Sequence, residues 1–154
     1  MDTKKVIQSQ YRAALAMLKR VVVKCPPEEW DNVQDKDRFW FVAYHTLRYA
    51  HLYLKAQDQG YPRWEVRRYS QQDTPFSKEE ILERLTLVEQ DVAEQIPIMD
   101  LDGKSGYNWI TTNKLELQLD NIRHIQQHTG ELYQRLSTRN VKLPWVSERH
   151  KEAK

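Results

Sequence analysis

The sequence predicts an all-α protein, a four-helix bundle with long connections. Apolar residues recur at three- and four-residue spacing in four separate stretches, each long enough for an amphipathic helix. Only 4 residues are glycine, fewer than a loop-rich β architecture uses. The length of 154 residues suits one closed hydrophobic core. We therefore expect a single bundle domain over residues 1–154, with a flexible tail at about 145–154.

The composition favours a soluble, cytoplasmic protein. Hydrophobic residues make up 40% of the chain, and no apolar run approaches the roughly 20 residues that span a bilayer. The N-terminal segment lacks the apolar stretch of a secretory signal. Cys25 is the only cysteine, which excludes an internal disulfide and fits a reducing compartment. A formal net charge of +2 argues against nucleic-acid binding by electrostatics alone.

The first predicted helix runs from about Thr3 to Val23, where apolar residues follow the helical period. Pro26 and Pro27 end this helix, because the residue before a proline avoids the α region and proline has no amide donor. Trp30 is assigned to the connection that follows.

The second predicted helix spans about residues 37–56 and starts near Asp35 or Asp37. It carries six aromatic residues, so we expect it to be largely buried. A long connection, Gln57–Phe76, follows it, and ordered loops of this length are often functional. Its Arg63–Arg68 segment combines arginines with a tryptophan, a mixture that can contact phosphate and stack on a base. A solvated loop is the favoured interpretation of this segment.

The third predicted helix starts with a capping box, formed by Ser77 and Glu80. It runs to about Glu94, and Pro97 closes it. The fourth helix covers about residues 114–138 and precedes the charged tail. Two of the connections are too long for hairpins, which predicts a bundle other than the simple up-down-up-down arrangement.

Three histidines in the predicted helices have the spacing of a metal site. His124 and His128 lie four residues apart, so both rings reach one point beside the last helix. His45 lies on a buried stripe of the second helix and supplies a third nitrogen. His51 lies about 120° around the same helix from it, and a rim or surface position suits His51 better. His150 is in the charged tail and is set aside. Histidines that are simply satisfied in the core are the competing interpretation.

Neutral imidazoles suit Zn, Ni, Fe or Mn, and three of them leave coordination positions open. Glu131, one turn beyond the last histidine, is a candidate to orient a ligand or to act as a base, although an exposed carboxylate is the simpler interpretation. Asn121 is a weaker candidate for a similar supporting contact. Gly130 costs about 1 kcal/mol in a helix relative to alanine, which suggests close approach of a helix or ligand. Cys25 is expected to be a buried small residue rather than a nucleophile.

The last predicted helix carries NIRHIQQHTGEL and the second carries FWFVAYHTLRYAHLYL. Both segments resemble the histidine-bearing segments of the DinB-like superfamily, a group of metal-binding four-helix bundles. The resemblance implies metal ligands at His45, His124 and His128, a divalent metal that is often zinc or nickel, and frequent homodimers. This chain departs from the family pattern in having Gln127 before the last ligand and Glu131 where a glutamine is usual.

Relatives in that superfamily include S-transferases and an isomerase that use low-molecular-weight thiols such as bacillithiol or mycothiol. The first functional hypothesis is therefore a metal-dependent enzyme for thiol transfer or hydrolysis, with a pocket beside the second helix. Trp40, Tyr44 and Tyr49 could line that pocket, but plain core positions are favoured for them. The alternative is a non-enzymatic, stress-related bundle whose metal is structural or absent. The least favoured hypothesis is that the protein associates with nucleic acid.

Overall fold

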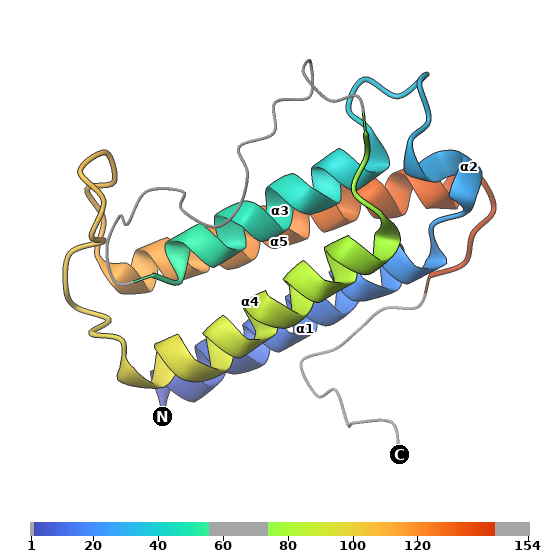
Figure 1. The fold of residues 1–154 in the computed structure, drawn as a ribbon. Helices are drawn as coiled ribbons and strands as arrows, with labels where there is room; N and C mark the ends of the chain where they lie inside the picture. Colours follow the sequence, from blue (N-terminus) through green and yellow to red (C-terminus); the bar gives the residue numbers. More distant parts are fainter. Residues whose placement is uncertain (1, 56–73, 144–154) are drawn as a thin grey trace.

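The structure is a computed structural model that describes residues 2–55 and 74–143. Within these ranges the chain forms α-helices and no β-strand. Four long helices and one short helix make up the fold (Figure 1): α1 (Thr3–Lys24), α2 (Pro27–Trp30), α3 (Phe39–Tyr53), α4 (Lys78–Ile98) and α5 (Lys114–Ser137). None of the described helices combines the length and the apolar character that a bilayer crossing requires.

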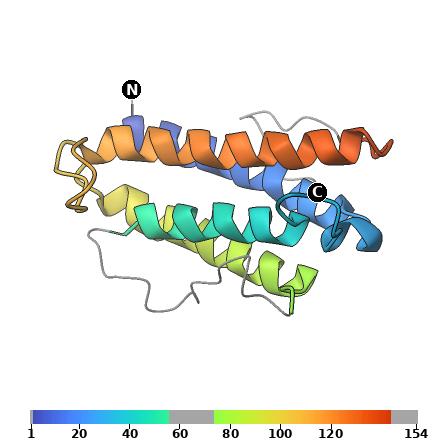
Figure 2. The ribbon, with the colours of Figure 1, turned by 90° about the horizontal axis from the view of Figure 1, so that it is seen from above.

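The four long helices pack as a bundle. Helices α1 and α3 each contact both α4 and α5. Figures 1 and 2 show that α1 and α5 run in one direction, whereas α3 and α4 run in the opposite one. The neighbours α3 and α4 are therefore parallel to each other, as are α1 and α5. The expectation of an arrangement other than up-down-up-down is confirmed.

Local capping explains where three of the long helices begin. The Asp2 side chain accepts a hydrogen bond from the amide of Lys5 and caps α1. At α4 the predicted capping box is present, because Ser77 Oγ accepts from the amide of Glu80 at 3.1 Å and Glu80 Oε2 accepts from the amide of Ser77 at 2.7 Å. Asn113 caps α5 in the same way as Asp2 caps α1. These side chains satisfy amides that have no partner inside the helix.

The connection after α1 contains a short helix that the sequence analysis missed. Pro26 and Pro27 do end α1, as predicted, but Pro27 then opens α2, since its fixed φ suits the first position of a helix. Trp30 belongs to this helix rather than to a loop. Its Nε1 donates to the carbonyl of Phe76 at 2.8 Å, and its ring lies 5.6 Å from the ring of Phe39. These long-range contacts hold the turn in helical form.

Three predicted helix ends differ from the structure by two to four residues. Helix α4 continues past Glu94 to Ile98 and contains Pro97 in its last turn. Proline there removes only one amide donor, and the complete burial of Ile96 holds the turn against the core. Helix α3 begins at Phe39 and ends at Tyr53, so it is shorter at both ends than the predicted span of residues 37–56.

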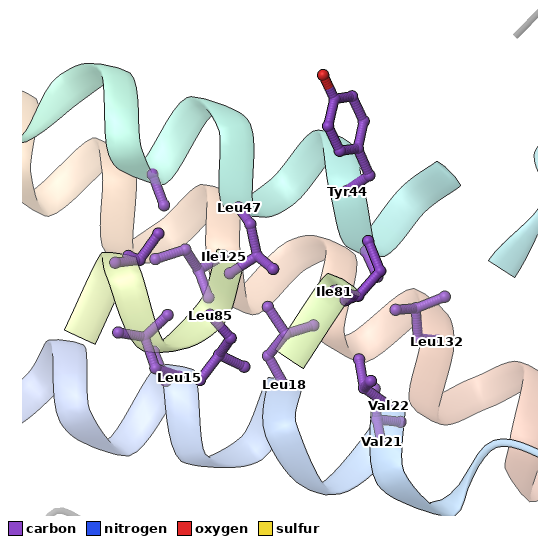
Figure 3. Packing of buried hydrophobic residues seen from close by; sticks show 14 of the residues in the cluster. Leu15, Leu18, Val21, Val22, Tyr44, Leu47, Ile81, Leu85, Ile125 and Leu132 are labelled. Atoms are coloured by element: carbon purple, nitrogen blue, oxygen red, sulfur yellow. The ribbon is translucent and has the colours of Figure 1, made fainter. Parts of the chain in front are cut away.

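One large hydrophobic cluster fills the space between the long helices. Leu15 and Leu18 of α1, Leu85 of α4 and Ile125 of α5 are fully buried and converge near the bundle axis (Figure 3). Trp40 and Tyr44 of α3 are also almost fully buried, with 2% and 1% of their surface exposed. Both therefore have the core role that the sequence analysis favoured over pocket lining.

Side chains of α5 fix the register of α3 against it. Asn121 Nδ2 donates to the carbonyl of Ala50 at 3.2 Å, and Gln118 Nε2 donates to the carbonyl of Tyr53 at 2.9 Å. These carbonyls lie in the last turn of α3, where the helix itself supplies few donors. Tyr11 of α1 donates to Gln118 Oε1 at 2.6 Å and completes the buried network. In this antiparallel register the middle of α3 lies opposite the middle of α5.

Some predictions fall on residues 56–73 and 144–154, outside the described parts of the chain. They include the Arg63–Arg68 segment, most of the predicted long connection, the predicted tail and His150.

Candidate metal centre

The three histidines selected from the sequence lie together at the contact between α3 and α5. His45 comes from α3, whereas His124 and His128 come from successive turns of α5. One ring nitrogen of each lies within 4.8 Å of the others. The ring centroids are separated by 5.3 Å, 5.0 Å and 4.7 Å, close to an equilateral triangle. The helix register described above therefore brings residues about 80 positions apart into one cluster.

The nitrogen spacing fits a small divalent ion. Nε2 of His45 lies 3.4 Å from Nε2 of His124. A tetrahedral ion with metal–nitrogen bonds of about 2.0–2.1 Å separates two ligand nitrogens by about 3.3–3.4 Å. An ion of that size therefore fits between these two rings without a shift of either helix.

Electrostatics keep two of these imidazoles neutral. Burial, followed by the neighbouring His128 and Arg48, lowers the pKa of His45 to about 4. Burial, followed by His128 and His45, lowers the pKa of His124 to about 4. At pH 7 both rings therefore carry a free lone pair, and a metal has no proton to displace from either of them.

A carboxylate holds the third histidine. Nδ1 of His128 lies 3.2 Å from Oε2 of Glu131 on the next turn of α5. An ionised carboxylate can only accept a hydrogen bond, so this contact favours the tautomer with the proton on Nδ1 and the lone pair on Nε2. The other oxygen of Glu131 accepts from Nη2 of Arg135. This contact fits the suggested role of Glu131 in orienting a ligand, while its role as a base stays a prediction.

Asn121 lies three residues before His124 on α5, but no hydrogen bond joins the two side chains. Among the described residues, His124 Nδ1 and Asn121 Oδ1 are buried atoms with no hydrogen-bond partner. His124 turns Nε2 toward His45, so Nδ1 is a donor when Nε2 binds a metal. Asn121 uses Nδ2 on Ala50 and keeps Oδ1 as an acceptor. Metal-bound histidines usually donate their second N–H to such an acceptor.

Aromatic side chains form one wall of the cluster. The ring of His45 lies 6.4 Å from Phe41 and 4.8 Å from Tyr49, and Tyr49 lies 5.6 Å from the ring of His124. Cζ of Arg48 lies 5.5 Å from the centroid of Tyr49. All three histidines are half-buried, so the cluster combines a partly apolar wall with partial access to solvent.

His51 is not part of the cluster, in agreement with its angular position on α3. It is more than a surface residue, however, because its Nδ1 lies 2.5 Å from Oδ2 of Asp91 on α4. Lys55 Nζ lies 2.7 Å from the other oxygen of Asp91. These contacts join α3 and the residues just after it to α4, a partnership that the sequence could not reveal.

Cys25 has the buried position that the sequence analysis expected. It is a free cysteine with 1% of its surface exposed. Burial raises the pKa of its thiol to about 12, so little reactive thiolate is present at pH 7.

The expected close approach of a helix at Gly130 was wrong. A Cβ built at this position would meet nothing within 4 Å. Gly130 is exposed on α5, so no neighbouring helix among the described residues requires the glycine, and the approach of a ligand stays a prediction.

The sequence analysis missed the charged residues that surround the cluster on the side of Glu131. Arg135 binds Glu131 and also lies 3.6 Å from Asp35 in the segment before α3. The four-residue spacing of Glu131 and Arg135 was a visible signal. The pairing with Asp35 depends on the tertiary structure alone.

Comparisons with known proteins add no identification. No family model matches the chain, and neither curated proteins nor solved structures give a match. The class defined by fold and site is thus a helical bundle with a histidine cluster that could hold a metal ion.

Proposed function

We propose that this chain is a divalent-metal-binding protein of DinB-like type, with His45, His124 and His128 as the metal ligands. The observation that carries the proposal is the convergence of three imidazoles from two helices within 4.8 Å. The low pKa values of His45 and His124 support it, because neutral rings are the form that binds metal.

Zinc is the metal that we propose first, with nickel next and iron or manganese as further candidates. The 3.4 Å separation of the Nε2 atoms of His45 and His124 supports zinc, which favours tetrahedral sites. An octahedral ion with similar bonds brings neighbouring ligand nitrogens to about 2.9 Å, so the two rings would have to move closer together.

The proposed activity is thiol transfer or hydrolysis on a small molecule. A divalent ion with an open position binds a thiolate or polarises an oxygen of substrate or water. The protein contributes three imidazole ligands, the Glu131 carboxylate that contacts His128, and Tyr49 as a wall beside the rings. From the resemblance to DinB-like proteins we propose a low-molecular-weight thiol as partner and a homodimer. We propose a cytoplasmic location because the single cysteine, which is buried, cannot form an internal disulfide.

A second candidate is a metal with a purely structural role. The ligands come from both α3 and α5, so a bound ion would link two helices and stabilise the bundle without any reaction. This candidate shares the ligand set with the first and differs only in the absence of a substrate position.

Metal analysis of untagged protein tests the proposal. We expect one equivalent of zinc or nickel per chain after loading, and a large loss of affinity when any one of the three histidines is replaced by alanine. His51→Ala is the matched control, because His51 lies on α3 but pairs with Asp91 instead. Less than about a tenth of an equivalent, with no gain on adding zinc or nickel, would exclude the proposed centre.

A cobalt-loaded sample separates the two candidates. Addition of a monothiol to an open cobalt site produces a sulfur-to-cobalt charge-transfer band in the near ultraviolet. We expect this band in the native protein if the centre binds thiol substrates. A closed structural site gives no new band and an unchanged visible spectrum.

A further inference from the structure

A chain of charged side chains leads from the histidine cluster to the segment that precedes α3. Glu131 contacts Nδ1 of His128 with one carboxylate oxygen and Arg135 with the other. Arg135 also donates from Nη1 to the carbonyl of Asp37 and lies 3.6 Å from Asp35. The chain thus begins at a proposed metal ligand on α5 and ends beside the first residue of α3.

We infer that Arg135 is a positioning residue of the metal centre and acts through Glu131. The inference rests on the proposed function, because it assigns Arg135 a role toward the ligand His128. Arg135 itself reaches neither the histidines nor the open coordination position in the contacts of the described residues.

The Glu131 side chain needs a second contact to stay in place beside His128. Its side chain is 40% exposed, and a glutamate this accessible to water gains little from a single ion pair while it loses rotamer freedom. The Arg135 side chain is only 17% exposed and is held at several points. A planar guanidinium with several fixed donors restricts the carboxylate to the rotamer that faces His128.

The same arginine couples the two helices that supply the ligands. Asp35 and Asp37 lie in the segment just before α3, and α3 carries His45. Arg139 reinforces the segment, since its Nε lies 2.7 Å from Glu29 and its Nη2 lies 3.6 Å from Asp35. Arg135 differs from Arg139 in that it holds Glu131 and the carbonyl of Asp37, whereas Arg139 binds Glu29.

The direction in which zinc affinity changes when Arg135 is removed distinguishes a positioning role from a purely electrostatic one. Arg135 carries a positive charge, so its removal lowers the repulsion felt by a divalent cation and by itself tightens metal binding. Positioning predicts the opposite result, because Glu131 leaves Nδ1 of His128 once its anchor is lost. Loss of such an outer partner of a metal-bound histidine costs about 10–100-fold in affinity.

The test measures the zinc dissociation constant of the full chain by competition with a chromophoric chelator. Glu131→Gln and Arg135→Gln should each weaken binding about 10-fold. The double variant should also weaken it about 10-fold rather than about 100-fold, because both changes break one contact. Arg139→Gln is the matched control and should stay within about twofold of the native affinity, since it lacks contact with Glu131.

Nitrogen NMR of the His128 ring in the metal-free protein gives a second readout, which a general loss of stability does not move. We expect the Nδ1-protonated tautomer in the native protein and in Arg139→Gln, and a mixture of tautomers in Arg135→Gln. If Arg135→Gln does not fold, Arg135→Lys replaces it, because lysine keeps the charge but cannot hold both partners in a fork.

Unchanged or tighter zinc binding by the Arg135 variant would overturn the inference, as would fully additive losses in the double variant. Failure of the native protein to bind any metal would instead refute the proposed function. In that event the NMR measurement still decides whether Arg135 orients the His128–Glu131 pair, so the two failures are distinguishable.

Discussion

Replacement of His45 by alanine should abolish the stabilisation of this protein by zinc. His124 and His128 lie four residues apart on one helix, so a partly unfolded chain with a helical α5 can still offer both of them to a metal. His45 is on α3 and reaches them only in the folded bundle. A ligand stabilises a protein only in so far as it prefers the folded state. His45 is therefore the ligand that makes zinc bind the folded state in preference to the unfolded state.

The expected size of the effect follows from this linkage. Free zinc at 100 times its dissociation constant stabilises the native state by about 2.7 kcal/mol. For a chain of this length each kcal/mol raises Tm by about 2–4 °C, so zinc should raise the native Tm by about 5–11 °C. In His45→Ala the shift should fall to about 1 °C or less, because the remaining pair binds folded and unfolded chains almost equally.

Thermal unfolding followed by circular dichroism, with and without zinc, measures this difference directly. His51→Ala provides the control, since it loses its contact with Asp91 and should lower Tm in both conditions while it keeps the zinc-induced shift. A shift in His45→Ala as large as in the native protein would refute the cross-helix site. If His51→Ala also lost the zinc-induced rise in Tm, the rise would depend on the stability of α3 in general and not on His45 as a ligand.

Three further predictions concern stability. Gly130→Ala should stabilise the metal-free protein by up to about 1 kcal/mol in urea unfolding, because the position is helical and open, and a loss of stability would contradict the assigned environment. Ile125→Ala should cost about 2–5 kcal/mol by the same assay, since Ile125 is fully buried in the core. Burial raises the pKa of Asp91, but hydrogen bonds from His51 and Lys55 lower it more, so the net shift is downward. Asp91→Asn should therefore cost about 1–3 kcal/mol at pH 7, and the cost should shrink as the pH falls below about 4 through the folded-state pKa; a cost independent of pH would exclude an ionised Asp91 as the source.

Much of the helical framework was predictable because its signals are local. The capping box at Ser77 and Glu80 fixes the start of α4 through bonds within one turn. The prolines after α1 end it for equally local reasons. Helix ends without such signals were predicted less well. Helix α4 passes through Pro97 because core burial of Ile96 holds its last turn, and burial cannot be read from a short window of sequence.

The candidate site, too, was predictable only where its geometry depends on neighbouring residues of one helix. The four-residue spacing of His124 and His128 was enough to place both rings on one face of α5, since helical geometry fixes that relation. The approach of His45 depends on the register between α3 and α5, which Asn121 and Gln118 set by binding carbonyls of α3. The helical period indicated the face on which His45 lies but contained no information about that register.

The sequence by itself thus determined the four long helices, the capping box of α4 and the paired histidines of α5, because each depends on atoms within about one helical turn. Only the tertiary structure decided that His45 meets that pair, that Arg135 holds Glu131 against His128, and that His51 binds Asp91 instead. Each of these contacts depends on a residue from another helix or from the segment before α3, and its geometry follows from how the whole core packs.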